Sequence, residues 1–509
     1  MAFNSVAFFI LLGIAVPAYY LVRKKYQWII LLFASVAFYA FAGLSSAGFI
    51  LVTALSTFFA GKLLAKLPKE QKKIRRRIVL LVLLVNFGML LVVKYANFIG
   101  GSVNVVTSLF SGRQVIPVMN ILLPLGISFY IFQSISYVID IYRGKCQPER
   151  NFAKYLLFVS FFPQVVQGPI NKFDELSSEL FAERSLDYEN VKHGIQLMLF
   201  GFLKKLIIAD RLAIMVDHVF KSYNAYGGAI VFFTVFVYSV QLYCDFSGGI
   251  DVARGCAGLF GINLTENFRQ PFFAVSIDDY WRRWHISLSR WMKDYLFYPL
   301  SLSKAFTRLG RKTRKWFKGY VGKVLPTCLA TFVVFLAVGA WQGGSWKYIA
   351  YGIWNGALIS LGILFKPLTT AIRKKSGVKD NSVAMTVFGI ARTILLITVG
   401  RYFSRAIGFR AALDMLRHTV DVVAPGELFN GTILTLGLNV YEWALVLCAL
   451  GAVFLVGLIR ERGKSVGQVL DKKPAAVQFA VVFSVVCVLI IWCIFSQGYI
   501  ASEFIYRQV

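Results

Sequence analysis

Long apolar stretches recur along the whole chain, and they limit what it can fold into more than any other feature. A helix that crosses a bilayer needs about 20 apolar residues. Stretches that reach or approach this length lie at residues 3–22, 28–42, 49–64, 78–93, 115–139, 230–243, 325–340, 348–365, 383–399, 440–459 and 476–495. We therefore predict an all-α, polytopic membrane protein with roughly eleven transmembrane helices.

The composition agrees with a chain that lies mostly in lipid. Hydrophobic residues make up 57% of the chain and charged residues 16%, whereas ordinary globular domains carry about 25% charged residues. Length alone would suggest several soluble domains, but that reasoning does not apply to a helical bundle in a bilayer. We expect a single membrane-embedded domain over residues 1–509.

The net charge of +30 raises the possibility of nucleic-acid binding, which the positions of the charges argue against. Basic residues occur in short runs between apolar stretches, at residues 23–25, 66–77, 304–323, 366–379 and 460–473. Cytoplasmic loops of membrane proteins carry such runs, and these runs sit well against anionic lipid headgroups. Their spacing places the N-terminus outside, with membrane lipids rather than nucleic acid as the partner.

Three regions depart from simple spans. Residues 152–180, which contain FFPQVVQGPINKF, and residues 267–302 are apolar but interrupted. Irregular backbone at membrane depth is tolerated only where it is buried in protein or lines a water-filled cavity. Pro163, Gly168 and Pro169 therefore indicate a re-entrant turn that faces a cavity in the first region. Residues 191–220 mix apolar side chains with Lys204 and Asp210, which favours a helix lying partly in the cytoplasmic interface.

A dense polar cluster surrounds His285 in the segment DDYWRRWHISLSRWMKDYLFYPL, residues 278–300. Ser276 and Asp279 have capping-box spacing, so we expect one helix to begin there and continue through Tyr295. Such a helix could lie on the membrane surface, with an incidental histidine. It could also enter an internal tunnel, where ionisable groups are costly and usually functional. A histidine there could move a proton near neutral pH.

The spacing of cysteine and histidine residues does not indicate a metal or cofactor site. The seven cysteines form no CxxC pair, and no His/Cys spacing suggests zinc. His193, His218 and His418 lie in mixed polar segments without a partner pattern, which favours surface positions. We predict no metal site and no bound cofactor.

Several motifs occur in a characteristic order along the chain. They are FFPQVVQGPI (161–170), ENFRQPF (266–272), YWRRWHISLSRWMKDYLFYPL (280–300), WQGGSWKYIAYGIWNG (341–356), SRAIGFRAAL (404–413) and the ending FIYRQV (504–509). Together they resemble the membrane-bound O-acyltransferase (MBOAT) family, in particular its bacterial alginate O-acetyltransferase branch. The teichoic acid D-alanyl transferases are more distantly similar.

This resemblance implies a multi-helix protein of the bacterial plasma membrane with a central tunnel. It implies transfer of an acyl group, expected to be acetyl, to hydroxyls of a cell-surface or exported polysaccharide. The donor would be a cytoplasmic thioester, either acetyl-CoA or a protein-bound acyl thioester. An exported or extracellular glycan-modifying protein would be the partner.

The resemblance also implies a catalytic centre, but two positions depart from the family pattern. His285 occupies the first histidine position. The family Trp-His-Gly motif reads Trp341-Gln342-Gly343, and a later His-Gly reads Asn355-Gly356. Glutamine and asparagine form hydrogen bonds but cannot act as bases near neutral pH. We therefore expect His285 to be the base and Gln342 to orient the acceptor hydroxyl or stabilise the oxyanion.

Further residues are predicted to bind substrate. Arg282 and Arg283 could attract the phosphates of the donor, and Gln167 is expected to shape the tunnel wall. The remaining substrate-binding candidates are Trp284, Asp294 and Asn355. The substitution at Gln342 leaves one alternative open, a catalytically inactive or repurposed homologue that acts as a scaffold or transporter-like partner in glycan modification.

Overall fold

The computed structural model describes residues 2–41, 43–111, 115–119, 121, 123–375 and 382–494; the ending at residues 504–509 lies outside them. This part of the chain is helical and contains no β-strand, which confirms the all-α prediction. Contacts divide the chain into two compact units: unit 1 comprises Met1–Asp210, Tyr243–Glu266 and Arg462–Val509, and unit 2 comprises Arg211–Leu242 and Asn267–Glu461. The expectation of a single domain stays a prediction.

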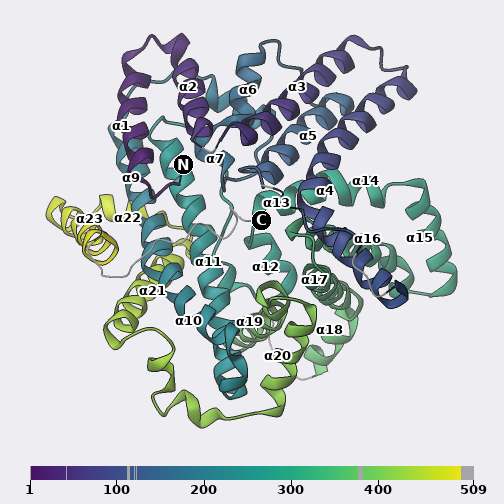
Figure 1. The fold of residues 1–509 in the computed structure, drawn as a ribbon, viewed down its shortest axis with the longest axis vertical. Coiled ribbons are helices and arrows are strands. Elements are labelled where there is room, and N and C mark those ends of the chain that lie inside the picture. Colours follow the sequence, from purple (N-terminus) through teal and green to yellow (C-terminus); the bar gives the residue numbers. More distant parts are fainter. Residues whose placement is uncertain are drawn as a thin grey trace. The chain divides into compact units, whose positions relative to one another are not determined.

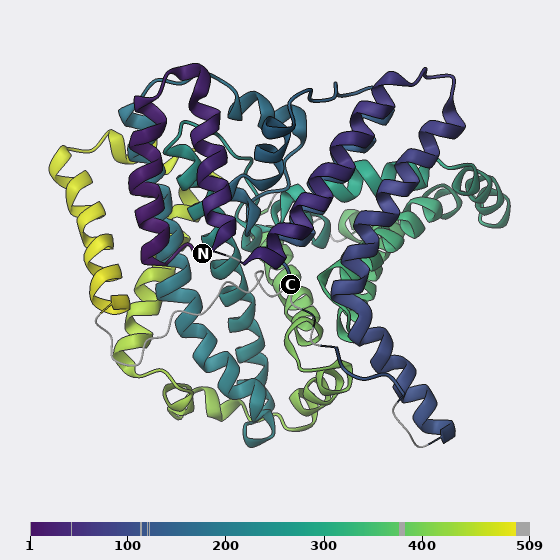
Figure 2. The same ribbon diagram turned by 45° about the horizontal axis from the view of Figure 1, so that its top comes forward.

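Unit 1 is built on a hairpin of two apolar helices, α1 (Val6–Leu21) and α2 (Gln27–Ala40), which lie side by side in Figures 1 and 2. Phenylalanine rings fill its interior; the Phe38 and Phe162 centroids, for example, are 5.9 Å apart. The other elements are α3 (Leu44–Lys66), α4 (Lys72–Ser111), α5 (Ile127–Arg143), α6 (Phe152–Ser160), α7 (Phe162–Val165), α8 (Phe173–Leu180), α9 (Tyr188–Phe202), η2 (Leu203–Ala209), the second half of α11 (Gly228–Gly258), α22 (Val466–Asp471), α23 (Ala475–Leu489) and η8 (Ile490–Ile494).

Unit 2 is organised around a second close hairpin, formed by α16 (Tyr320–Gln342) and α17 (Trp346–Leu364). A Cβ atom on Gly339 would lie 2.4 Å from the Tyr348 carbonyl oxygen, so only glycine permits this approach. The other helices are α10 (Asp210–Lys221), the first half of α11, α12 (Ile277–Arg283), α13 (Ile286–Met292), α14 (Tyr298–Ser301), α15 (Lys304–Trp316), α18 (Lys366–Lys375), α19 (Val383–Arg405), α20 (Phe409–Asp421) and α21 (Val440–Glu461).

Seven helices among the described residues are long and apolar enough to cross a membrane, or eight if a bent pair counts as one span. The bent pair joins Trp346–Leu364 to Lys366–Ile372 at 57°. Every stretch predicted to span the membrane overlaps a helix, but the count of eleven is not confirmed. The difference arises from short helices, since α1, α2 and α5 have 16, 14 and 17 residues.

The position of residues 191–220 in the cytoplasmic interface stays a prediction, but the charged side chains in the middle of this segment lie inside the protein. Lys204 and Lys205 lie on a π-helical turn, η2, and both are buried. The Lys204 ammonium lies 2.7 Å from Asp251, and the Lys205 ammonium contacts Asp245 and, at 2.9 Å, Asp210. These charges are compatible with burial because they are paired.

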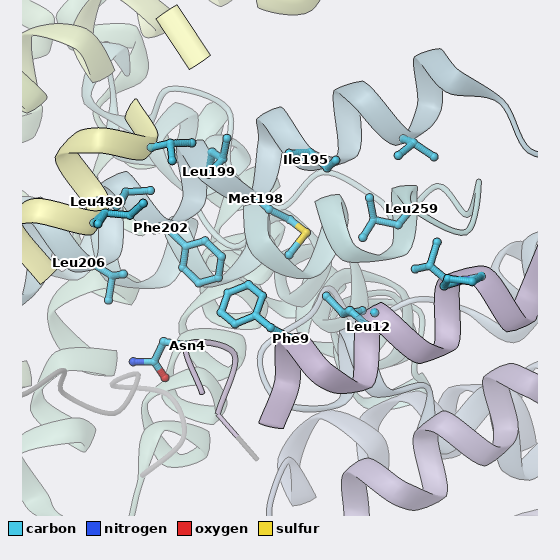
Figure 3. A pocket seen from close by; sticks show the side chains of 16 residues that line it. Asn4, Phe9, Leu12, Ile195, Met198, Leu199, Phe202, Leu206, Leu259 and Leu489 are labelled. Atoms are coloured by element: carbon cyan, nitrogen blue, oxygen red, sulfur yellow. The ribbon is translucent and has the colours of Figure 1, made fainter. Parts of the chain in front are cut away.

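An apolar pocket of about 770 Å³ opens in unit 1 between α1, α9 and α23. Phe9, Leu12, Phe202 and Leu489 point into it, and Asn4 is the polar residue at its edge (Figure 3). Its lining offers no acid, base or nucleophile. The pocket therefore does not supply the groups that acyl transfer needs.

Candidate active site around His285

The polar segment around His285 forms two helices rather than one. Its predicted start is confirmed, because the Ser276 hydroxyl accepts a hydrogen bond from the Asp279 amide at 3.1 Å and caps α12. The prediction of one helix through Tyr295 is wrong: α12 ends at Arg283, and α13 begins at Ile286. His285 stands between them in the left-handed conformation, with φ 48° and ψ 54°.

Backbone contacts from the preceding loop hold this break. The carbonyl oxygen of Asn267 accepts from the Ile286 amide at 3.0 Å, and its side-chain Oδ1 accepts from the Ser287 amide at 2.8 Å. Phe268 forms an isolated antiparallel bridge with Trp284. A left-handed non-glycine residue costs on the order of 1 kcal/mol and persists only where its surroundings over-determine it. Such strain is concentrated at active sites, which makes His285 the leading catalytic candidate.

The imidazole of His285 is buried, with 1% of the residue exposed. Its Nδ1 lies 3.2 Å from Nδ2 and 3.4 Å from Oδ1 of Asn267, and its ring centroid is 5.8 Å from that of Trp341. Burial lowers the pKa of His285 to about 3. The ring is therefore neutral near pH 7, with one nitrogen that donates and one that accepts.

Trp284, the residue before this histidine, is fixed by aromatic and cationic neighbours. Tyr280 stacks on its indole at 5.5 Å between centroids, and the Arg401 guanidinium lies 5.0 Å from the ring centroid. Arg401 is itself buried and donates to the Tyr280 hydroxyl at 2.8 Å and the Tyr351 hydroxyl at 3.2 Å. Trp284 thus serves as a rigid anchor for the strained residue that follows it. Its predicted contact with substrate stays a prediction.

The two positions that depart from the family pattern lie on the α16–α17 hairpin. Gln342 is the last residue of α16, half-buried, and directly follows Trp341, whose ring contacts the imidazole. Asn355 is buried in α17, where its Oδ1 accepts from the Trp281 indole at 3.1 Å and its Nδ2 donates to the Tyr351 carbonyl at 2.9 Å. Asn355 therefore connects α12 to α17.

The two arginines before His285 contact acidic partners. Arg282 lies on the surface beside Asp278, with its Nη2 2.8 Å from the carboxylate. Arg283 contacts Asp279 at 3.1 Å and Glu461 at 2.8 Å. Because these carboxylates already compensate both guanidiniums, binding of donor phosphates would have to displace them. Their role toward the donor stays a prediction.

Gln167 belongs to unit 1, in the interrupted segment that was predicted to be re-entrant. The segment consists of short buried helices. Three side-chain amides form consecutive hydrogen bonds there, since Gln164 donates to Gln133 at 2.8 Å and accepts from Asn171 at 2.8 Å. Gln167 is fully buried, and neither its Oε1 nor its Nε2 has a hydrogen-bond partner among the described residues. Asp294 lies half-buried on η5 (Lys293–Phe297) in unit 2. Their predicted roles are untested.

Two residues of the site were missed from the sequence, Asn267 and Arg401. Asn267 lies within the quoted ENFRQPF motif, but its contact with His285 arises only when the chain folds back. Arg401 follows an apolar stretch that was predicted to end at residue 399. A charge at the end of such a span is a signal in itself, because charges within membrane domains are usually functional.

One cluster of possible metal ligands occurs elsewhere, in unit 1. Glu189, His193 and Asp471 bring one ligand atom each to within 4.8 Å of one another. His193 was expected to lack a partner pattern, yet its Nε2 lies 3.0 Å from Asp471. Lys192 contacts both carboxylates, at 2.6 Å and 2.9 Å, and thereby compensates their charge. This arrangement reads as an ion-pair network that joins α9 to α22.

Comparison with known proteins gives a consistent result. Residues 149–403 match the model of the membrane-bound O-acyltransferase family. The chain is 34% identical over 414 residues to the "Probable alginate O-acetylase AlgI" of Pseudomonas syringae pv. tomato, covering 81% of this chain and 74% of that protein. It is 29% identical over 422 residues to the "Peptidoglycan O-acetyltransferase" of Helicobacter pylori (78% and 73%) and 29% identical over 250 residues to the "Teichoic acid D-alanyltransferase" of Bacillus subtilis (48% and 60%).

Proposed function

Because this chain belongs to the membrane-bound O-acyltransferase family, we propose that it moves an acetyl group from a cytoplasmic thioester to hydroxyls of a cell-surface or exported polysaccharide. Two of the similar proteins are named for O-acetylation of alginate and of peptidoglycan, both polymers rich in hydroxyl groups. The D-alanyltransferase is more distant and matches less of the chain. This pattern favours acetyl over aminoacyl transfer.

The observation that carries the proposal is the strained, buried imidazole of His285 beside Trp341. In the reaction the acceptor oxygen bonds to the thioester carbon, the C–S bond breaks, and the hydroxyl proton finally resides on sulfur. The developing oxyanion needs a donor, and the loss of one such donor costs about 10²–10³-fold in rate. His285 and Gln342 are the groups that we assign to the reacting atoms.

The proposal includes the location and partners of the protein. The donor is acetyl-CoA or a protein-bound acyl thioester, and the lysines and arginines of the cytoplasmic loops would attract its phosphates. The protein lies in the plasma membrane with its N-terminus outside. An exported glycan-modifying protein completes transfer to the polysaccharide.

Purified protein in lipid nanodiscs tests this function. Labelled acetyl-CoA and an acetylated carrier protein are offered in turn with alginate or peptidoglycan fragments, and label on the glycan is counted. We expect transfer by the wild type and a loss of about 10²–10³-fold in His285→Ala. His218→Ala is the matched control, because this histidine is exposed on α10 and its Nε2 lies 2.8 Å from the Tyr226 hydroxyl. A His285→Ala variant as active as the control would refute the assignment.

The alternative function, an inactive or repurposed homologue, is favoured by one observation. Gln342 stands where the family pattern has histidine, and an amide cannot take a proton near neutral pH. The same assay separates the two readings. A wild type without activity that Gln342→His makes active would establish the alternative, whereas a wild type that transfers acetyl groups would exclude it.

A further inference from the structure

The orientation of the Asn267 amide is fixed by a group other than His285. Its Oδ1 accepts from the Ser287 amide at 2.8 Å, and a backbone N–H can only donate. The Nδ2 end of the same amide lies 3.2 Å from Nδ1 of His285, closer than Oδ1 at 3.4 Å. Because an amide nitrogen only donates, Nδ1 is the acceptor of this hydrogen bond.

We propose that Asn267 is a positioning residue that keeps the His285 proton on Nε2, so that His285 acts as a neutral hydrogen-bond donor to the thioester carbonyl. This inference rests on the proposed acyl transfer and changes the role of the histidine within it. In a neutral imidazole whose Nδ1 accepts, the single proton resides on Nε2. That nitrogen then has no lone pair with which to take the hydroxyl proton.

The step is balanced without a protein base. As the acceptor oxygen bonds to the carbonyl carbon, the Nε2–H of His285 stabilises the negative charge that develops on the carbonyl oxygen. The C–S bond then breaks, the sulfur takes the proton that the hydroxyl releases, and His285 retains its own proton. The products are the acetyl ester and the thiol.

Burial of the site supports this role. The low pKa of His285 keeps the ring neutral across the physiological range, and Asn267 is fully buried beside it. An asparagine cannot stabilise an imidazolium as a carboxylate does. A histidine that serves as a base commonly has such a carboxylate at Nδ1 to hold the proton there, and here an amide nitrogen takes that place.

The tautomer can be measured without any assay of activity. The chain has four histidines, so a protein labelled with ¹⁵N in its histidine rings gives few signals, and His285→Gln identifies those of His285. Solid-state NMR in lipid separates protonated from unprotonated ring nitrogens. We expect a protonated Nε2 and an unprotonated Nδ1 at pH 7.5. A protonated Nδ1 would overturn the proposal, whether or not the protein transfers acetyl groups.

Replacing Asn267 by aspartate tests the role in catalysis. The carboxylate would draw the ring proton to Nδ1 and raise the pKa of His285, leaving Nε2 as an acceptor. We expect transfer at pH 7.5 to fall about 10²-fold or more and to recover as the pH is lowered and the imidazolium regains its Nε2 proton. If His285 were the base, the variant would be at least as active as the wild type at pH 7.5 and would lose activity in acid.

Two further variants separate chemistry from folding. His285→Gln supplies an amide donor without a usable base, and Gln270 shows that glutamine can adopt a left-handed conformation in this protein, with φ 41°. We expect it to transfer at least about tenfold faster than His285→Ala, which has no donor. Asn104→Asp is the control, because Asn104 is an asparagine of unit 1 that also binds backbone groups. This variant should retain the wild-type pH profile of transfer. Should Asn267→Asp not fold, the wild-type NMR spectrum decides.

Equal activity in His285→Gln and His285→Ala, together with a protonated Nδ1, would leave acyl transfer in place and remove only the donor role. Absence of transfer from every donor, together with the expected tautomer, would instead remove the proposed function and keep the assignment of Asn267.

Discussion

Acidification should destabilise this protein through protonation of His285 in the unfolded chain. Burial lowers the pKa of this ring to about 3 in the folded chain, against about 6.5 in an unfolded chain. Below pH 6.5 the unfolded chain therefore binds a proton that the folded chain excludes, so the free energy of unfolding decreases as the pH falls. Above pH 6.5 both states are neutral at this position, and the stability is fully present. The loss continues down to about pH 3, where the folded ring also becomes protonated.

The magnitude follows from these two pKa values. Between pH 7 and pH 5 the proton linkage amounts to about 2 kcal/mol, or about 30-fold in the unfolding equilibrium constant. Other titratable groups also contribute to the pH dependence of the wild type. Comparison with His285→Gln removes them, because distant sites contribute nearly equally to both proteins.

The assay is thermal unfolding in nanodiscs, followed by intrinsic fluorescence at pH 7, 6 and 5 for both proteins. We expect the wild type to lose about 2 kcal/mol of stability relative to His285→Gln on going from pH 7 to pH 5. A difference that does not change with pH, or a wild type that gains stability relative to the variant in acid, would refute the reasoning. Either result would mean that the folded site accepts a proton on the imidazole.

Two further predictions concern a buried ion pair and a helix cap. Lys205→Met should destabilise unit 1 by about 3 kcal/mol, because Asp210 and Asp245 would lose a buried cation that contacts both. Part of the lost stability should return in the double variant with Asp245→Asn. A Lys205→Met protein that melts at the same temperature as the wild type would contradict this prediction. Ser276→Ala should lower the stability of α12 by about 1 kcal/mol, because the helix loses its N-terminal cap. The measurement is hydrogen exchange at the Asp279 amide, which should become faster. Unchanged exchange at this amide would show that the cap is not needed.

Features that depend on local pattern could be predicted from the sequence. The apolar stretches located the long helices, and the Ser276–Asp279 spacing located the start of α12. The number of spans could not be predicted in the same way, because an apolar run does not specify helix length. The stretch at residues 115–139 illustrates this, since α5 begins only at Ile127, after left-handed Gly126.

Features that depend on distant contacts were missed for a physical reason. The periodicity of residues 276–295 is compatible with one helix, and nothing local reveals that the backbone of Asn267 accepts from Ile286 and breaks it. Likewise Lys204 and Lys205 look like surface charges until Asp251 and Asp245, which lie 47 and 40 residues later, are placed beside them. Helix periodicity shows which residues are neighbours on one helix. Both of these features depend instead on contacts between residues of different segments.

The substitution at Gln342 and the environment of His285 are consistent with one another under the donor role. A catalytic pair that works by proton abstraction requires at least one side chain with an available basic nitrogen. Gln342 cannot provide one, and an Nε2-protonated His285 would not provide one either. Both side chains can still direct hydrogen bonds at a polarised carbonyl and a hydroxyl, and in a buried site such bonds stabilise developing charge more strongly than in water. Retention of activity with glutamine at position 342 would then follow from the position of the ring proton, and restoration of histidine there would add a base to a site that does not depend on one.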